Sequence, residues 1–172
     1  MAKPQTEKEL AQLVDQLAPL MTEFELAMIV ARHAQEQWAL RCAAAAGFKG
    51  YSIMELLVLH MVGYGSKRIA DICFALKIED THIVSYALKK LVRAQLVESS
   101  KIGKDTFFLP TDKGREYIAA YGAIRKQRLI RAMAKFGGED LDLPQLTDML
   151  RVLSGLYEQA ARTAETSVVP SV

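Results

Sequence analysis

The chain has 172 residues, of which 51% are hydrophobic and 24% are charged, and its formal net charge is +2. This composition is typical of an ordinary folded domain and argues against disorder, which needs low hydrophobicity or high net charge. The two cysteines, Cys42 and Cys73, are too few for a disulfide scaffold and favour a reducing cytosol. No apolar run approaches the roughly 20 residues of a membrane span, and the first ten residues lack a signal-peptide core. We therefore expect a cytoplasmic protein.

Charge is distributed unevenly along the chain. Residues 1–46 carry a net charge of −2 and residues 139–172 carry −4, whereas residues 47–111 carry +3 and residues 112–138 carry +5. A basic middle between acidic ends predicts a central surface that meets a polyanion. A solvated basic face without any partner would give the same pattern.

Two helices are predicted in the first 46 residues. Thr6 and Glu9 form a capping-box pair ahead of helically spaced leucines, so a first helix should run from about residue 6 to residue 18. Pro19 should end it, because proline disfavours the α conformation of the residue before it. Thr22 and Glu25 form a second capping-box pair, which should start a helix that runs to about residue 46. This second helix is apolar on more than one face, which indicates packing on several sides.

Three short helices are predicted between residues 52 and 94. Ser52 should cap the first, which stops before residues 63–65, while Ser66 caps the second and Asp80 the third. Two short helices joined by a tight turn are typical of a helix-turn-helix. The third helix leaves polar and basic side chains outward and has a narrow apolar inner stripe, made of Val84, Ala87, Leu88, Leu91 and Val92.

The hydrophobic period changes after residue 96. Residues 97–102 and 106–109 flank a glycine turn at Gly103, which predicts a small β-hairpin, or wing, closed by Pro110. A long helix should follow from residues 111–112 to the glycines at 137–138, and Asp142 and Pro144 should start a last helix. The expected fold is therefore mainly α: a winged helix-turn-helix with a small β-hairpin wing and an α-helical dimerisation region.

The terminal helices are expected to form a homodimer, because their apolar stripes lie outside the compact helix-turn-helix and need a covering surface. The alternative is that they fold back on one subunit. The chain then divides into an N-terminal helical extension (1–21), a dimerisation helix (22–46), a winged helix-turn-helix region (47–111), a long helix with a C-terminal dimerisation helix (112–166) and a frayed tail (167–172). The dimerisation residues predicted on the last helix are Leu146, Met149, Leu150, Leu153 and Tyr157.

Residues 81–97, THIVSYALKKLVRAQLV, resemble the recognition helix and wing start of the MarR family of dimeric winged-helix transcription regulators. Residues 109–114 are similar to that family's exit from the wing into the next helix. Gln95 stands where the family usually has a left-handed glycine, and Lys104 stands at the wing tip where the family commonly has an arginine. The resemblance covers about residues 22–166. It implies a prokaryotic repressor that binds pseudo-palindromic operators in double-stranded DNA as a homodimer.

The DNA-binding residues follow from the predicted helix and wing. A polar helix start of this size suits the major groove, and lysine and arginine around it suit phosphates. The alternative is that these are ordinary surface residues, on a winged helix that docks another protein without binding DNA. The side chains expected at base edges are Thr81, His82, Ser85 and Tyr86, and those expected at phosphates or in the wing are Ser66, Lys67, Arg68, Lys89, Lys90, Arg93, Lys101 and Lys104.

Members of the resembled family often bind small aromatic effectors or sense oxidants through cysteine. The candidate effector pocket here contains Phe24, Met28, Trp38 and His60, although such residues at helical spacing also form ordinary cores. The two cysteines lack CxxC spacing and are expected to be inert buried thiols. The sequence holds no catalytic motif and no histidine pair at ligand spacing, so we expect neither an enzyme nor a metal or other cofactor.

Overall fold

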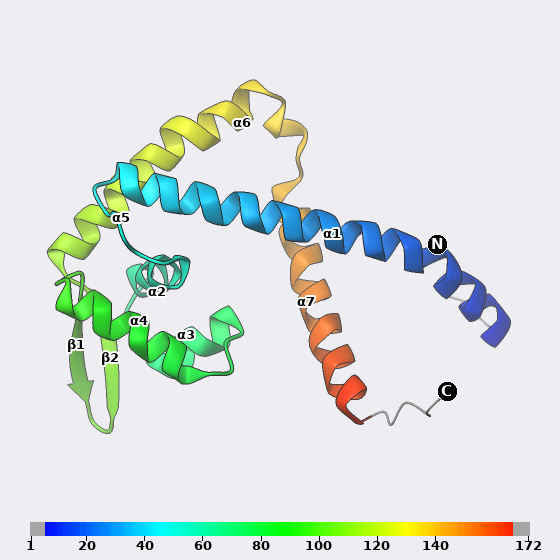
Figure 1. The fold of residues 1–172 in the computed structure, drawn as a ribbon, viewed down its shortest axis with the longest axis horizontal. Coiled ribbons are helices and arrows are strands. Elements are labelled where there is room, and N and C mark those ends of the chain that lie inside the picture. The colour runs from blue at the N-terminus through cyan, green and yellow to red at the C-terminus, as the bar shows by residue number, and fades with distance from the viewer. Residues whose placement is uncertain (1–5, 167–172) are drawn as a thin grey trace. The chain divides into compact units, whose positions relative to one another are not determined.

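The computed structural model describes residues 6–166, so the tail predicted at 167–172 lies outside the described residues. The chain divides between Arg125 and Lys126 into two compact units (Figure 1). Within the described residues, the first unit holds five helices and one antiparallel hairpin, and the second is helical. The predicted mainly α fold with a small hairpin is confirmed. The functional partition of the chain into dimerisation and DNA-binding parts stays a prediction.

The first helix is a single long element, α1 (Glu7–Ala45), so the prediction that Pro19 ends a helix is wrong. The capping box of Thr6 and Glu9 is confirmed, with both reciprocal hydrogen bonds present. Proline has no backbone N–H, so one hydrogen bond of the helix is missing at Pro19. The helix nevertheless continues on both sides of this residue. Thr22 does not cap a new helix, because its hydroxyl donates back to the carbonyl of Ala18 at 3.2 Å.

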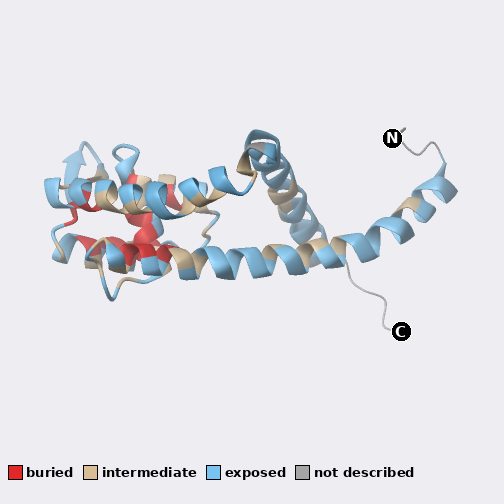
Figure 2. Ribbon diagram, turned by 90° about the horizontal axis from the view of Figure 1, so that it is seen from above, coloured by how far each residue is buried: buried red, intermediate tan, exposed pale blue. Residues whose placement is uncertain are grey.

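The core of the first unit lies among α2 (Ile53–Gly63), α3 (Ile69–Leu76), α4 (Thr81–Arg93) and α5 (Asp112–Arg125), with the C-terminal end of α1 against them. Figure 2 shows the buried residues gathered in this one region. Four of the five residues predicted for the inner stripe of α4 are buried. Val92 is the exception, with 38% of its surface exposed.

The helix caps explain most of the observed helix starts. Ser52 and Glu55 form the predicted capping box of α2, and the carboxylate of Asp80 accepts a hydrogen bond from the backbone of His82 at the start of α4. Ser66 is not a cap, so that prediction is wrong. Lys67, which follows it, exchanges two backbone hydrogen bonds with Phe108, of 3.0 and 2.8 Å, and this extended pairing delays the helix.

The wing is confirmed as a hairpin of β1 (Val97–Ile102) and β2 (Asp105–Pro110). Gly103 has φ 63°, which suits the two-residue turn between the strands. The isolated antiparallel bridge between Lys67 and Phe108 adds one residue of a third segment to this sheet. The wing is thereby joined to the segment that leads into α3, and not only to its neighbours in sequence.

The passage from α4 into the wing and then into α5 is closely packed. Gln95 adopts the left-handed conformation, with φ 59°, at the position where the resembled family has glycine. The hydroxyl of Thr111 donates to the Gln95 carbonyl at 2.7 Å. A Cβ atom at Gly114 would collide with the carbonyl oxygen of Leu96, so only glycine fits there. This close approach explains the glycine of the motif at residues 109–114.

The second unit continues as a π-helical turn (Lys126–Ile130), α6 (Arg131–Lys135), a 3₁₀ turn (Gly138–Asp140) and α7 (Leu143–Thr166). The predicted end near Gly137 and the start at Asp142 are confirmed, and Asp142 accepts a hydrogen bond from the backbone of Gln145 at 2.9 Å. None of the residues classified for burial in this unit is fully buried. The apolar side chains of α7 are therefore largely open to solvent.

Candidate nucleic-acid interface

The outward flank of α4 carries the side chains predicted for base contacts. Thr81, His82 and Tyr86 are exposed, and Tyr86 has 70% of its surface open, whereas Ser85 is half-buried. The opposite face of the helix is fixed by four buried apolar residues, so the orientation of the flank is set by the core. The structure thus brings these four residues together on one accessible helix surface.

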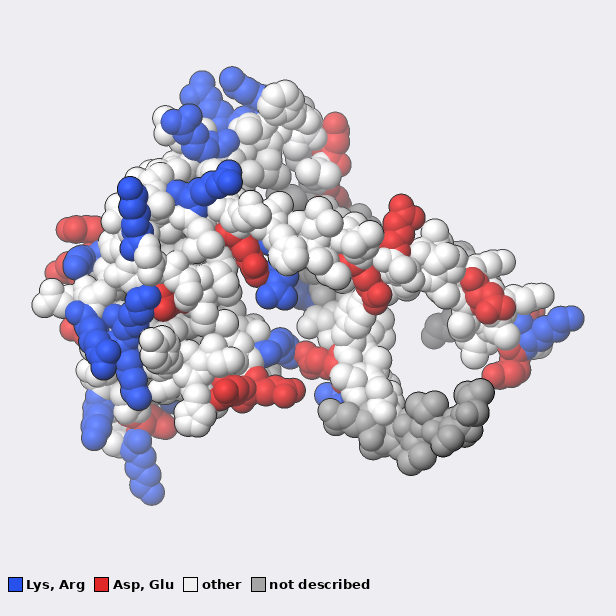
Figure 3. All heavy atoms as spheres, in the orientation of Figure 1, with Lys and Arg blue, Asp and Glu red and all other residues white. Residues whose placement is uncertain are grey.

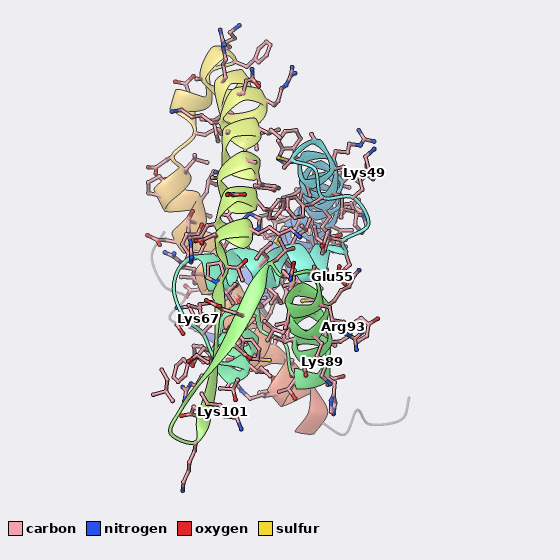
Figure 4. The ribbon with its side chains drawn as sticks, turned by 90° about the vertical axis from the view of Figure 1, so that its left-hand side faces the viewer. Lys49, Glu55, Lys67, Lys89, Arg93 and Lys101 are labelled. Carbon is pink, nitrogen blue, oxygen red and sulfur yellow. The ribbon has the colours of Figure 1, made fainter. Side chains whose placement is uncertain are left out.

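Basic side chains surround this flank. Lys89 and Arg93 are exposed on later turns of α4, and Lys101 and Lys104 are exposed on the wing. Figure 3 shows lysine and arginine gathered on the side of the first unit formed by α4 and the hairpin, and Figure 4 shows individual members of the group. Ser66 is exposed and Lys67 half-buried where the wing meets α3. This is the arrangement that phosphate contacts around a groove require.

Lys90, which was predicted to contact phosphate, has partners within the protein. Its ammonium group donates to the Oε2 atom of Glu55 at 2.9 Å and to the carbonyl of Gly50 at 3.1 Å, and it lies 5.4 Å from the centre of the Tyr51 ring. The hydrogen bond to Glu55 raises the pKa of Lys90. The charge of Lys90 is thus directed toward α2 and holds α4 against the start of that helix.

Arg68 also has partners within the protein. Its guanidinium donates to both carboxylate oxygens of Asp71, at 3.2 and 2.9 Å, and lies 3.6 Å from a carboxylate oxygen of Asp105 in the wing. These hydrogen bonds lower the pKa of Asp71 to about 2, and the same contacts raise the pKa of Arg68. Arg68 therefore links the start of α3 to the wing, with part of its charge already matched.

The comparisons with known proteins agree with this geometry. A family model described as a winged helix DNA-binding domain matches residues 52–114, which run from the cap of α2 into the start of α5. Residues 52–114 therefore have the fold of a winged helix domain. No curated protein matches the sequence.

Solved structures extend the likeness over most of the chain. A MarR family regulator from Neisseria meningitidis has a TM-score of 0.64 at 19% identity, over 87% of this chain and 98% of its own. Another MarR family transcription regulator has a TM-score of 0.63 at 16% identity, over 90% and 99%. The regulator MOSR of M. tuberculosis, solved in complex with DNA, has a TM-score of 0.60 at 14% identity, over 78% and 96%. The fold is that of MarR family regulators, as the sequence resemblance predicted.

Lys49 is a basic residue of the winged helix surface that sequence reasoning missed. It is exposed in the loop between α1 and α2, and in Figure 4 it lies on the same side of the view as Arg93 and Lys89. The only signal in the sequence was its place three residues before the Ser52 cap, where a loop lysine can approach a phosphate at a helix start.

A cavity of about 350 Å³ lies among α1, α2 and α5. Of the four residues predicted for an effector pocket, only His60 lines it; Phe24, Met28 and Trp38 are half-buried along α1 outside its lining. Nδ1 of His60 is 2.7 Å from the carbonyl oxygen of Leu56, and its ring stands edge-on to another lining residue. The other lining side chains with polar groups are Gln35, Tyr64, Tyr121 and Arg125.

The two cysteines are buried, and the described residues form no cluster of metal ligands. Cys42 and Cys73 are buried free cysteines, as predicted, and burial raises the pKa of the Cys42 thiol. Among residues 6–166, no three histidine, cysteine or acidic side chains come together as a metal site would need. No helix in this part of the chain is long and apolar enough to cross a membrane.

Proposed function

We propose that the chain is a transcription regulator, a repressor, that binds specific double-stranded DNA sequences as a homodimer. The observation that carries the proposal is the exposed flank of α4, with His82 and Tyr86 at its centre and Lys89 and Arg93 beside it, on a winged helix domain. A helix of this kind fits the major groove, which is about 12 Å wide. We propose the repressor role and a prokaryotic, cytoplasmic setting by analogy with the MarR family regulators whose fold the chain shares.

The proposed role of each side chain follows from its chemistry. Side chains on the first two turns of α4 would contact base edges, and the lysines and arginine around them would contact phosphates. Lys104 at the wing tip would reach the flanking backbone or the minor groove. Lys49 joins the phosphate-binding group, whereas Lys90 and Arg68 serve mainly to hold α4 and the wing in place, because their charges already have acidic partners.

Dimer formation is supported by the apolar side chains that the chain leaves exposed. On α7, Leu146, Met149 and Leu150 expose about half of their surface, and α1 exposes a second series that includes Leu26, Ile29 and Val30. Exposed apolar stripes of this length are typical of surfaces that a second copy covers. A two-fold pair would present its two recognition helices to successive major grooves, roughly 34–36 Å apart.

The cavity between α1, α2 and α5 is where we propose that a small aromatic effector binds. It combines the aromatic ring of Tyr121 with the polar groups of His60, Gln35 and Arg125. The guanidinium of Arg125 would favour an effector that carries a carboxylate or phenolate. Titration of the protein with benzoate and with uncharged benzyl alcohol tests this preference, and equal binding of the two would contradict it.

The test of DNA binding is selection of bound duplexes from a random pool with the purified full chain, repeated at several salt concentrations. We expect enrichment of two half-sites related by two-fold symmetry. Ser85→Ala and Tyr86→Ala should change the enriched sequence without removing affinity. Failure to bind duplex DNA even at low salt would contradict the proposal and would favour a winged helix that docks another protein.

A further inference from the structure

An apolar recess adjoins the base-contacting flank of α4. It has a volume of about 490 Å³ and lies between the start of α2 and the first two turns of α4. Its apolar walls come from Met54, Ile83, Tyr86 and Ala87, and its polar lining residues are Ser52, Glu55, Asp80 and His82. Ile83 exposes 45% of its surface and Tyr86 exposes 70%. A partner that enters the groove-facing side of α4 would therefore meet apolar surface directly beside the polar side chains.

The same two turns lack the side chains that make paired hydrogen bonds with purines. Residues 81–88 contain no arginine, lysine, asparagine or glutamine, which are the residues that contact guanine or adenine with two bonds. Two hydroxyls, one imidazole and one phenol are the polar groups available there. Specificity from this part of the helix must therefore depend strongly on apolar contacts.

Among the groups at the floor of the major groove, the C5-methyl of thymine is the apolar one. We propose that Ile83 and Tyr86 recognise thymine methyl groups of the operator, with Met54 closing the recess behind them. The inference rests on the proposed DNA-binding function and names the chemistry by which it selects sequences. The basic side chains Lys89 and Arg93 on the same helix supply the charge complementarity that brings a duplex to this surface.

The test replaces thymine by deoxyuridine in the selected operator, one position at a time. This change removes only the methyl group and keeps the base pair. Burying one methyl contributes enough to change affinity about fourfold, so we expect a loss of about fourfold at one or two positions in each half-site. At those positions, a 5-methylcytosine–guanine pair should be bound more tightly than a cytosine–guanine pair.

Matched variants assign the effect to the recess. Ile83→Ala and Tyr86→Ala should bind thymine and deoxyuridine operators alike, while Val92→Ala, an exposed apolar residue outside the recess, should keep the wild-type difference. Thermal unfolding confirms that each variant is folded. Sequence-specific binding that is insensitive to every deoxyuridine substitution would overturn the inference and leave the proposed function intact. Absence of any specific binding would overturn both.

Discussion

The ammonium of Lys90 donates a 2.9 Å hydrogen bond to Glu55, whose carboxylate belongs to the capping box of α2 and whose surface is only 4% exposed. One carboxylate thus caps one helix and anchors another. Removing its cationic partner would leave a buried carboxylate with the backbone hydrogen bond from Ser52 but no cation, which is more costly than losing an exposed ion pair. Lys90 differs in this respect from its neighbour Lys89, which is exposed.

The same substitution should therefore affect stability at Lys90 and DNA binding at Lys89. Lys90→Met is expected to lower the midpoint of thermal unfolding by a few degrees. Lys89→Met should leave the midpoint unchanged and weaken DNA binding at every sequence. Calorimetry and fluorescence anisotropy measure the two effects, and equal unfolding midpoints for the two variants would show that the hydrogen bond to Glu55 does not stabilise the fold.

The left-handed residue at the end of α4 makes a second prediction. Gln95 has φ 59°, a conformation that costs about 1 kcal/mol for a residue with a Cβ atom. Gln95→Gly is therefore expected to raise the free energy of unfolding by up to about 1 kcal/mol. Ala94→Gly is the matched control, because the neighbouring Ala94 has a right-handed backbone conformation and glycine there should destabilise.

Urea unfolding measures both variants. Because Ala94 lies at φ −77° and ψ −2°, inside the right-handed region, the control removes no strain and only adds freedom to the unfolded chain. A loss of stability in both variants would mean that the Gln95 side chain contributes more through its contacts than its backbone conformation costs.

Acid should weaken the link between the start of α3 and the wing. Hydrogen bonds from Arg68 lower the pKa of Asp71 from 3.8 to about 2, so the folded state favours the ionised carboxylate. The stabilisation is complete above the ordinary pKa and is lost as the pH falls through about 2. We expect Asp71→Asn to unfold more easily than the wild type at pH 5, with the difference closing toward pH 2.

The same comparison in an Arg68→Gln background provides the control. Without the guanidinium, Asp71 keeps only the 2.9 Å hydrogen bond from the backbone of Arg68, so Asp71→Asn should have a smaller effect than in the wild type. A difference between the wild type and Asp71→Asn that stays constant from pH 5 to pH 2 would contradict the role assigned to this ion pair.

The wing tip should contribute affinity without sequence preference. Lys104→Ala is expected to weaken binding to all duplexes by a similar factor. It should also reduce the slope of log K against log salt by about 0.9 for each phosphate no longer neutralised, which is about 1.8 for a dimer with two wings. Lys8→Ala, in the acidic first part of α1, should leave the slope unchanged. A Lys104→Ala variant with the wild-type slope would remove the wing tip from the phosphate-binding group.

The apolar stripe of α7 should control the oligomeric state. The wild type is expected to sediment at twice the chain mass of 19.1 kDa, and the double substitution Met149→Glu with Leu150→Glu should reduce it to the single-chain mass. Gln159→Glu adds a charge to the same helix outside the stripe and should leave the dimer intact. A wild-type monomer at all concentrations would rule out the homodimer.

Local signals in the sequence were sufficient for much of the fold. The pair of Ser52 and Glu55, the cap at Asp80 and the turn at Gly103 act through neighbouring residues, so their patterns are visible in short windows. The start of α3 was mispredicted because Lys67 pairs with a strand residue far along the chain, Phe108. No local window contains that pairing.

The candidate site also combines features that local sequence predicts with features that depend on contacts between distant residues. The exposed flank of α4 follows from the helical period, because the buried stripe fixes which side chains point outward. The role of Lys90 could not be predicted, since its partner Glu55 is 35 residues away and only packing brings them together. The predicted helix end at Pro19 was wrong because proline is a strong local signal for a helix end, and a long helix can continue through it.

The two backbone hydrogen bonds between Lys67 and Phe108 limit how the domain can be controlled. They tie the hairpin to the segment that leads into α3, so on the proposed function the span between groove and flank contacts would be built into each subunit. In the proposed dimer, a signal that releases the duplex would then act by moving one winged helix domain relative to the other. On that proposal, sensitivity to the signal would lie in the helices outside the winged helix domain, and substitutions there should alter response while sparing sequence choice.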